Sequence, residues 1–160
     1  TDSGGTQACA LLKQALAADP TNYRIHPELG QALLQTGALE EMEQLLRDLP
    51  PNIAQDDVFR LLRAQLAFAR AVEDAPALSE LEQQLAADAN NLDARFALAA
   101  RKVVAGEYEP AMENLLAIIR QDRRFRDDGG RRALVDVFAL LNNEGPLVRK
   151  YRGLLSGAIN

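Results

Sequence analysis

The stretch QALAADPTN at residues 14–22 recurs later in the chain as QQLAADANN at residues 83–91. Six of the nine positions are identical, and the same offset of 69 residues maps Gly37 onto Gly106. An offset of 69 is close to twice roughly 34 residues, which indicates two helix-turn-helix units per interval. We therefore expect repeated helical hairpins, each burying its apolar face against its neighbours.

Composition supports helices throughout. The 160 residues include 27 Ala and 26 Leu, the two best apolar helix formers, whereas aromatic residues make up 5% and Trp is absent. No segment has the β-branched and aromatic alternation that strands require. The sequence thus predicts an all-α protein, and its length fits one domain.

The period of these units is that of the tetratricopeptide repeat, in which small residues allow close helix crossings and large residues fill the gaps. The first match is partial and ends at Pro20, and a complete unit follows with Leu29-Gly30 and the turn residue Gly37. A second complete unit carries Leu98-Ala99 and Gly106 at the same positions. Pro110 begins its second helix, where a missing N–H costs nothing.

From this pattern we predict a short right-handed tetratricopeptide-like solenoid of about seven to eight antiparallel helices. Residues 1–5 are interpreted as a flexible lead-in and residues 6–160 as a single repeat domain. Its expected parts are a partial repeat at 6–20, a repeat at 21–51, a degenerate repeat at 53–89, a repeat at 91–122 and a capping helix pair at 129–159. In the degenerate repeat, Val58, Leu61, Leu62, Leu66 and Ala69 are expected on one helix face, without a fixed register.

Candidate catalytic and metal-binding residues are few. The single cysteine, Cys9, and the single histidine, His26, exclude a disulfide framework and multi-thiolate or His-rich metal sites. Both residues are interpreted as packing residues, because neither has a catalytic partner at motif spacing. We expect no enzyme activity, no cofactor and no metal. No apolar run is long enough to span a membrane, and we expect a cytoplasmic location.

Charge is distributed unevenly. The net charge is −5, with −9 in residues 1–119 and +4 in residues 120–160. Six arginines lie within thirteen residues, at positions 120, 123, 124, 126, 131 and 132. The Arg120–Arg132 cluster is the one candidate nucleic-acid surface, but interleaved aspartates and the single aromatic Phe125 argue against it. We interpret it as a solvated connection with local ion pairs, and a docking patch for an acidic protein is the alternative.

Two candidate binding surfaces remain. The last helix, 146–159, is amphipathic, and it is interpreted as a cap on the preceding repeat or as a docking element for a partner. Its expected partner-binding residues are Arg149, Lys150, Tyr151, Arg152, Leu154 and Leu155. The concave groove is expected to be formed by helices at 22–35, 54–72 and 92–105, with Arg24, Gln31, Gln35 and Asp93 as lining residues.

The chain resembles the C-terminal tetratricopeptide-like region of bacterial thioredoxin-fused co-chaperones, the YbbN or chaperedoxin type. The resemblance rests on the Gly37 and Gly106 units, the atypical middle pair through LEQQL at 81–85, and the closing segment VRKYRGLL at 148–155. It implies an upstream thioredoxin-like domain, and a stress-response holdase that binds unfolded clients and passes them to a chaperonin or an Hsp70-type chaperone. The last helix would dock the chaperonin. Cys9 does not correspond to the family's redox cysteine.

The predicted function is therefore a non-catalytic protein–protein interaction module. Two alternatives stay open. The apolar helix expected at 6–18 has no partner helix before it, which would suit a self-associating scaffold and a homo-oligomer. A nucleic-acid adaptor acting through the Arg120–Arg132 cluster is the weaker alternative.

Overall fold

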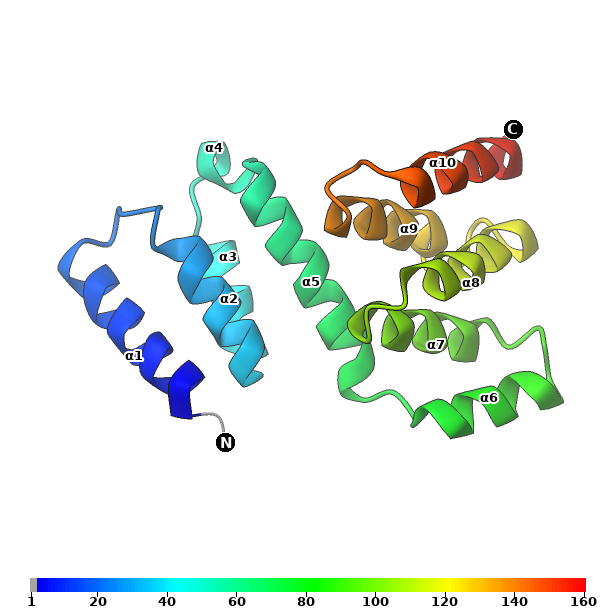
Figure 1. Ribbon diagram of the computed structural model, residues 1–160, viewed down its shortest axis with the longest axis horizontal. Helices are drawn as coiled ribbons and strands as arrows, with labels where there is room; N and C mark the ends of the chain where they lie inside the picture. The colour runs from blue at the N-terminus through cyan, green and yellow to red at the C-terminus, as the bar shows by residue number, and fades with distance from the viewer. Residues whose placement is uncertain (1–2) are drawn as a thin grey trace. The chain divides into compact units, whose positions relative to one another are not determined.

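The computed structural model describes residues 3–160, and over that range it contains helices and no strand (Figure 1). The expected all-α fold is confirmed. The helices are α1 (Ser3–Ala18), α2 (His26–Thr36), α3 (Leu39–Arg47), α4 (Pro51–Ala54), α5 (Asp57–Glu73), α6 (Leu78–Ala87), α7 (Leu92–Val104), α8 (Tyr108–Gln121), α9 (Gly129–Leu140) and α10 (Pro146–Ile159). The described residues thus form ten helices, more than the expected seven or eight. One of the additional helices is α4, a single turn that begins at Pro51.

The helices belong to two compact units. Unit 1 ends at Ala67 and unit 2 runs from Phe68 to Asn160, so the boundary falls within α5. Phe59 and Leu62 of α5 belong to the core of unit 1, and Phe68 belongs to the core of unit 2. On the expected apolar face, Leu62 is buried and Leu66 packs against the core, but the placement of Val58 is wrong, because Val58 is 43% exposed whereas Phe59 is 1% exposed. The larger apolar surface of the phenylalanine ring determines which face of α5 is buried.

In unit 1, α1 packs against α2 and α2 packs against α3. The α2–α3 turn depends on Gly37, which adopts φ +76°, a left-handed conformation that closes the C-terminus of α2. Gly30 allows α5 to approach α2, since a Cβ there would lie 3.1 Å from Cδ1 of Leu62. The core around these contacts includes Leu29, Leu33, Met42, Leu46, Phe59 and Leu62.

Two predicted boundaries in unit 1 are wrong. α1 begins at Ser3, so residues 3–5 are helical and not a flexible lead-in, whereas residues 1 and 2 lie outside the described residues. The first helical turn needs no intrahelical partners for its N–H groups, so Gly4 and Gly5 can extend the helix at modest cost. α2 begins at His26 and not at Asn22. Residues 19–25 form turns, in which the Asn22 side chain accepts a hydrogen bond from the backbone of Arg24.

In unit 2, α6 packs against α7, α7 against α8, and both α9 and α10 against α8. α8 is the central helix of this unit, and its Met112, Leu115 and Ile118 are fully buried. α10 runs parallel to α8, because Lys150 near its start contacts Glu109 and its last residue, Ile159, accepts a hydrogen bond from Arg123, just beyond the end of α8. α7 thus packs against α8 and also against α6.

Candidate functional site

Unit 2 contains an open cleft of about 490 Å³. Its walls come from the end of α5, the 74–76 connection, α6, the first half of α7 and the loop between α8 and α9. The volume lies within the ~300–1,000 Å³ typical of ligand-binding clefts. Because α7 is the first helix of a complete hairpin, the cleft lies on the surface that this architecture uses for binding.

The floor of the cleft is apolar. Leu81 of α6 and Ala94 of α7 are buried, and they form a small core of their own together with Leu98. Ala71 and Ala97 also line the cleft, and their small side chains leave its volume open. Phe96 is half-buried and contributes the one aromatic ring among the lining residues. The floor can therefore accept aliphatic side chains.

The 74–76 wall is fixed by an arginine from α7. The Arg101 guanidinium donates hydrogen bonds to the carbonyl oxygen of Pro76 at 2.6 Å and to that of Ala75 at 2.7 Å. These bonds satisfy two backbone carbonyl groups of the connection between α5 and α6. They also hold Asp74, an exposed carboxylate, at the edge of the cleft.

The opposite edge carries a second carboxylate and an arginine. Asp93 in the first turn of α7 accepts a hydrogen bond from Nη2 of Arg126 at 2.9 Å. The Arg126 guanidinium carbon also lies 4.7 Å from the centroid of the Phe96 ring and 5.1 Å from that of Phe125. Arg126 therefore forms an ion pair and two cation–π contacts at the edge of the cleft.

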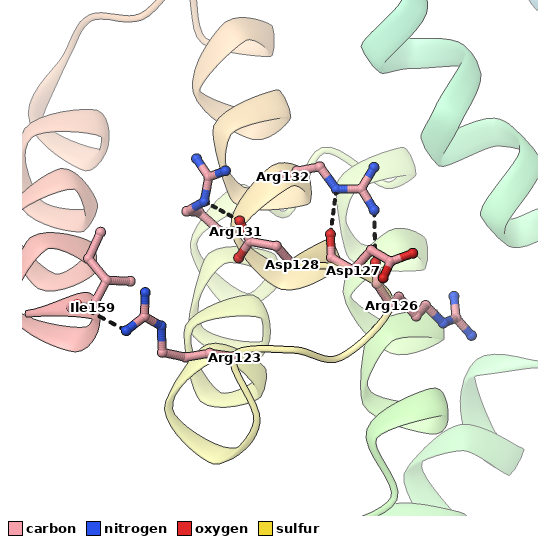
Figure 2. A network of polar contacts seen from close by, with 7 residues as sticks. All are labelled: Arg123, Arg126, Asp127, Asp128, Arg131, Arg132 and Ile159. Atoms are coloured by element: carbon pink, nitrogen blue, oxygen red, sulfur yellow. Dashed lines mark hydrogen bonds and ion pairs between the residues drawn. The ribbon is translucent and has the colours of Figure 1, made fainter.

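Arg126 reaches this position through an unusual loop. Arg126, Asp127 and Asp128 all have positive φ, at 49°, 54° and 66°. Figure 2 shows how the loop is held: Arg132 donates to the backbone carbonyls of Arg126 and Asp127, and Arg131 pairs with the Asp128 carboxylate. Consecutive left-handed residues other than glycine are strained, and such strain is typical of functional loops.

The predicted groove residues are divided between the two units. Asp93 lines the cleft, whereas Arg24, Gln31 and Gln35 belong to unit 1 and stay predictions for a surface there. Sequence reasoning did not assign Asp74 or Phe96 to a site, and it placed Arg126 only in the Arg120–Arg132 cluster. The only available signals were an aromatic residue in the first helix of a repeat and an arginine in a charged loop, and neither reveals that the two meet.

The predicted partner-binding residues of α10 are corrected in part. Tyr151 is 1% exposed and Leu155 is 9% exposed, and both pack in the core of unit 2, so neither is available on the surface. Their spacing put them on the apolar stripe that docks α10 against α8. Leu154 is half-buried, while Arg149, Lys150 and Arg152 are exposed. The helix is thus docked as a cap, with its basic side outward.

Polar contacts reinforce the docking of α10. Tyr151 donates a hydrogen bond to Oε1 of Glu113 at 3.4 Å, and burial raises the pKa of its phenol. Lys150 donates to Oε2 of Glu109 at 3.0 Å and so lowers the pKa of that carboxyl. Arg152 donates to Asn143. The exposed Arg149 side chain makes no hydrogen bond or ion pair within residues 3–160.

The Arg120–Arg132 cluster is largely engaged within unit 2. Arg126, Arg131 and Arg132 bind the groups described above, and Arg123 donates to the Ile159 carbonyl at 3.1 Å (Figure 2). Arg124 and Arg120 are exposed. This arrangement supports the interpretation as a connection with local ion pairs and weakens the nucleic-acid alternative.

Cys9 and His26 are buried, as their interpretation as packing residues requires. Sγ of Cys9 lies 4.0 Å from Oγ1 of Thr36, and Nδ1 of His26 lies 3.0 Å from the carbonyl oxygen of Asn22. On α1, Leu11 is 66% exposed, which is the feature that keeps self-association open. Residues 3–160 contain no group of side chains that could hold a metal ion and no helix with the length and apolarity of a membrane span.

Comparison with known families agrees with the repeat pattern. Residues 71–160 match one tetratricopeptide repeat model and residues 5–66 match another. The chain belongs to the tetratricopeptide repeat family. Repeats of this kind generally mediate protein–protein interactions through extended binding surfaces.

Among solved structures, the chain is similar to a domain of the Vibrio parahaemolyticus protein VP0806, whose function is unknown. The identity is 26%, the match covers 96% of this chain and 90% of the other, and the TM-score is 0.46. No curated protein matches the chain. The resemblance to thioredoxin-fused co-chaperones therefore stays a prediction.

Proposed function

We propose that this chain is a non-catalytic protein-binding module that holds an extended segment of a partner protein in the unit 2 cleft. The observation that carries the proposal is the cleft itself: an apolar floor and a charged edge on the first helix of a tetratricopeptide hairpin. Its lining residues include no histidine, cysteine, serine or lysine. Binding without chemistry is the activity that such a lining suits best.

The finer proposal follows the family resemblance. The partners would be unfolded clients, together with a chaperonin or an Hsp70-type chaperone, and the setting would be the bacterial cytoplasm under stress. The exposed basic side of α10, with Arg149 and Arg152, supports a second contact that is separate from the cleft. One surface would hold the client while the other meets the chaperone.

Client binding is tested by the suppression of aggregation of a chemically denatured model enzyme. Ala97→Gln fills the cleft floor with a neutral side chain, and Ala86→Gln makes the same change at an exposed position of α6 outside the lining. We expect Ala97→Gln to lose suppression and Ala86→Gln to keep it. Full suppression by a folded Ala97→Gln variant would exclude the cleft as the client site.

Chaperone docking is tested in the same preparation with purified chaperonin. Truncation of α10 is unsuitable, because Val148, Tyr151 and Leu155 are core residues whose loss would unfold unit 2. The single change Arg149→Glu reverses a charge on the exposed side of α10, and it leaves the contacts of Arg152 with Asn143 and the buried Phe138 ring in place. We expect it to abolish chaperonin binding and leave client binding intact, and unchanged chaperonin binding would refute α10 as the docking element.

A further inference from the structure

Arg126 occupies its place at the cleft through its side chain alone. The backbone of its loop is held independently, by Arg132 on the carbonyls of Arg126 and Asp127 and by Arg131 on Asp128. The Arg126 and Asp93 side chains are 50% and 77% exposed, so their ion pair is solvated and exchangeable. The guanidinium can therefore leave the cleft by rotation of its side chain, while the loop keeps its conformation.

What Arg126 leaves behind is a site shaped for a guanidinium. The Asp93 carboxylate lies at hydrogen-bonding distance and the faces of Phe96 and Phe125 lie within cation–π range. A planar guanidinium suits such a combination of carboxylate and ring better than an ammonium does. The arginine of the chain itself shows where a partner's arginine would lie.

The charge of the cleft points to the same ligand. Its lining contains two carboxylates, Asp74 and Asp93, against one cation, Arg126. With Arg126 rotated out, both carboxylates face the cleft without a cation. An acidic segment would place further negative charge between them, whereas an arginine would offset one of the two negative charges, as Arg126 does in the free chain.

We infer that the partner segment carries an arginine flanked by aliphatic residues, and that Arg126 is a built-in competitor that occupies the subsite of this arginine in the free chain. The partner's arginine replaces Arg126 against Asp93 and Phe96, and its aliphatic neighbours contact the floor formed by Ala94, Ala97 and Leu81. The inference rests on the proposed function, because it names the chemistry of the segment that the cleft binds.

The test uses three synthetic peptides that differ at one residue. Each is a capped heptapeptide with leucines on both sides of a central arginine, glutamine or glutamate and a tryptophan near its end. The chain contains no tryptophan, so the emission reports on the peptide alone. We expect the arginine peptide to bind the native chain more tightly than the glutamine peptide, and the glutamate peptide to bind most weakly.

Three variants separate the roles. Arg126→Asn removes the competitor while asparagine tolerates the left-handed backbone, and Arg124→Asn removes the same charge from the same loop outside the cleft lining. We expect Arg126→Asn to tighten binding of the arginine peptide by roughly fivefold, the scale of one exposed ion pair and a cation–π contact. Arg124→Asn should change nothing. In the Arg126→Asn background, where no competitor also uses Asp93, Asp93→Asn should weaken the arginine peptide by roughly tenfold, as expected for loss of a charge-assisted bond, and spare the glutamine peptide.

The outcomes distinguish this inference from the proposed function. If the glutamine peptide binds as tightly as the arginine peptide and Ala97→Gln blocks both, the cleft binds proteins but has no arginine subsite. If the glutamate peptide binds best and Arg126→Asn weakens it, Arg126 is an anion receptor and the inference is overturned. If no peptide binds the native chain or Arg126→Asn, the inference fails, and aggregation suppression by Ala97→Gln decides the function separately.

Discussion

The hairpins α2–α3 and α7–α8 share one set of core positions but differ on the binding surface. At the offset of 69 residues, five positions are buried in both: Leu29 with Leu98, Gly30 with Ala99, Met42 with Ala111, Leu46 with Leu115 and Leu49 with Ile118. At the same offset, Phe96 corresponds to Pro27 and Asp93 corresponds to Arg24. The repeat thus preserves the residues that join two helices, while the residues that line a cleft vary freely.

The largest effect is expected in the shared core. Leu115→Ala should cost about 2–5 kcal/mol of unfolding free energy, because it leaves a cavity at a position with 0% exposure. Leu46→Ala, at 6% exposure, should fall at the lower end of that range. Urea denaturation followed by circular dichroism measures both, with the exposed Leu11→Ala as a near-neutral control. A loss under about 1 kcal/mol for Leu115→Ala would show that Leu115 does not fill the same core position in α7–α8 that Leu46 fills in α2–α3.

The two turn glycines should respond equally. Gly37 and Gly106 have φ of +76° and +78°, and an added Cβ at either would meet nothing within 4 Å. Alanine there should therefore cost about 1–2 kcal/mol through backbone conformation alone. Gly153→Ala is the matched control, because this exposed helical position also has open space, and there alanine should stabilise by about 0.5–1 kcal/mol. Thermal unfolding of all three variants measures these changes in stability. Different losses for Gly37→Ala and Gly106→Ala would show that the two turns are not equivalent.

The smallest effect concerns Asp136 of α9, a half-buried carboxyl in unit 2. Burial raises its pKa above 3.8, with Arg132 opposing the shift. Since the folded pKa lies above the unfolded value, ionisation of this carboxyl lowers stability as the pH rises through that interval. Asp136→Asn should raise Tm slightly at neutral pH and leave it unchanged well below pH 3.8, where both states are protonated. An equal rise at both pH values would assign the effect to packing and not to charge.

Sequence patterns predicted the local features and missed the distant ones. Gly37 and Gly106 determine turns and Pro110 marks the start of α8 through their own backbone preferences, which can be recognised in the sequence alone. The register of α5 was left unassigned and Val58 was placed on the wrong face, because a helix that contributes to two cores has apolar residues on more than one face. The pattern of residues did not show which face of α5 packs in which core.

The cleft was beyond local prediction for a similar reason. Arg126 meets Asp93 across 33 positions of sequence, and it does so only because Arg131 and Arg132 hold a left-handed loop. Asp93 was predicted as a lining residue because it begins the first helix of a repeat. Tyr151 was assigned to a partner because its stripe could face either the core or a ligand, and only packing against α8 decides between them.

The left-handed backbone at Arg126 has an evolutionary consequence. Glycine adopts positive φ without strain, and every arginine codon becomes a glycine codon through a single nucleotide change. The loop can therefore lose its arginine in one mutational step and relax as it does so. Descendants of this chain can switch the edge of the cleft between occupied and vacant without passing through an unstable intermediate.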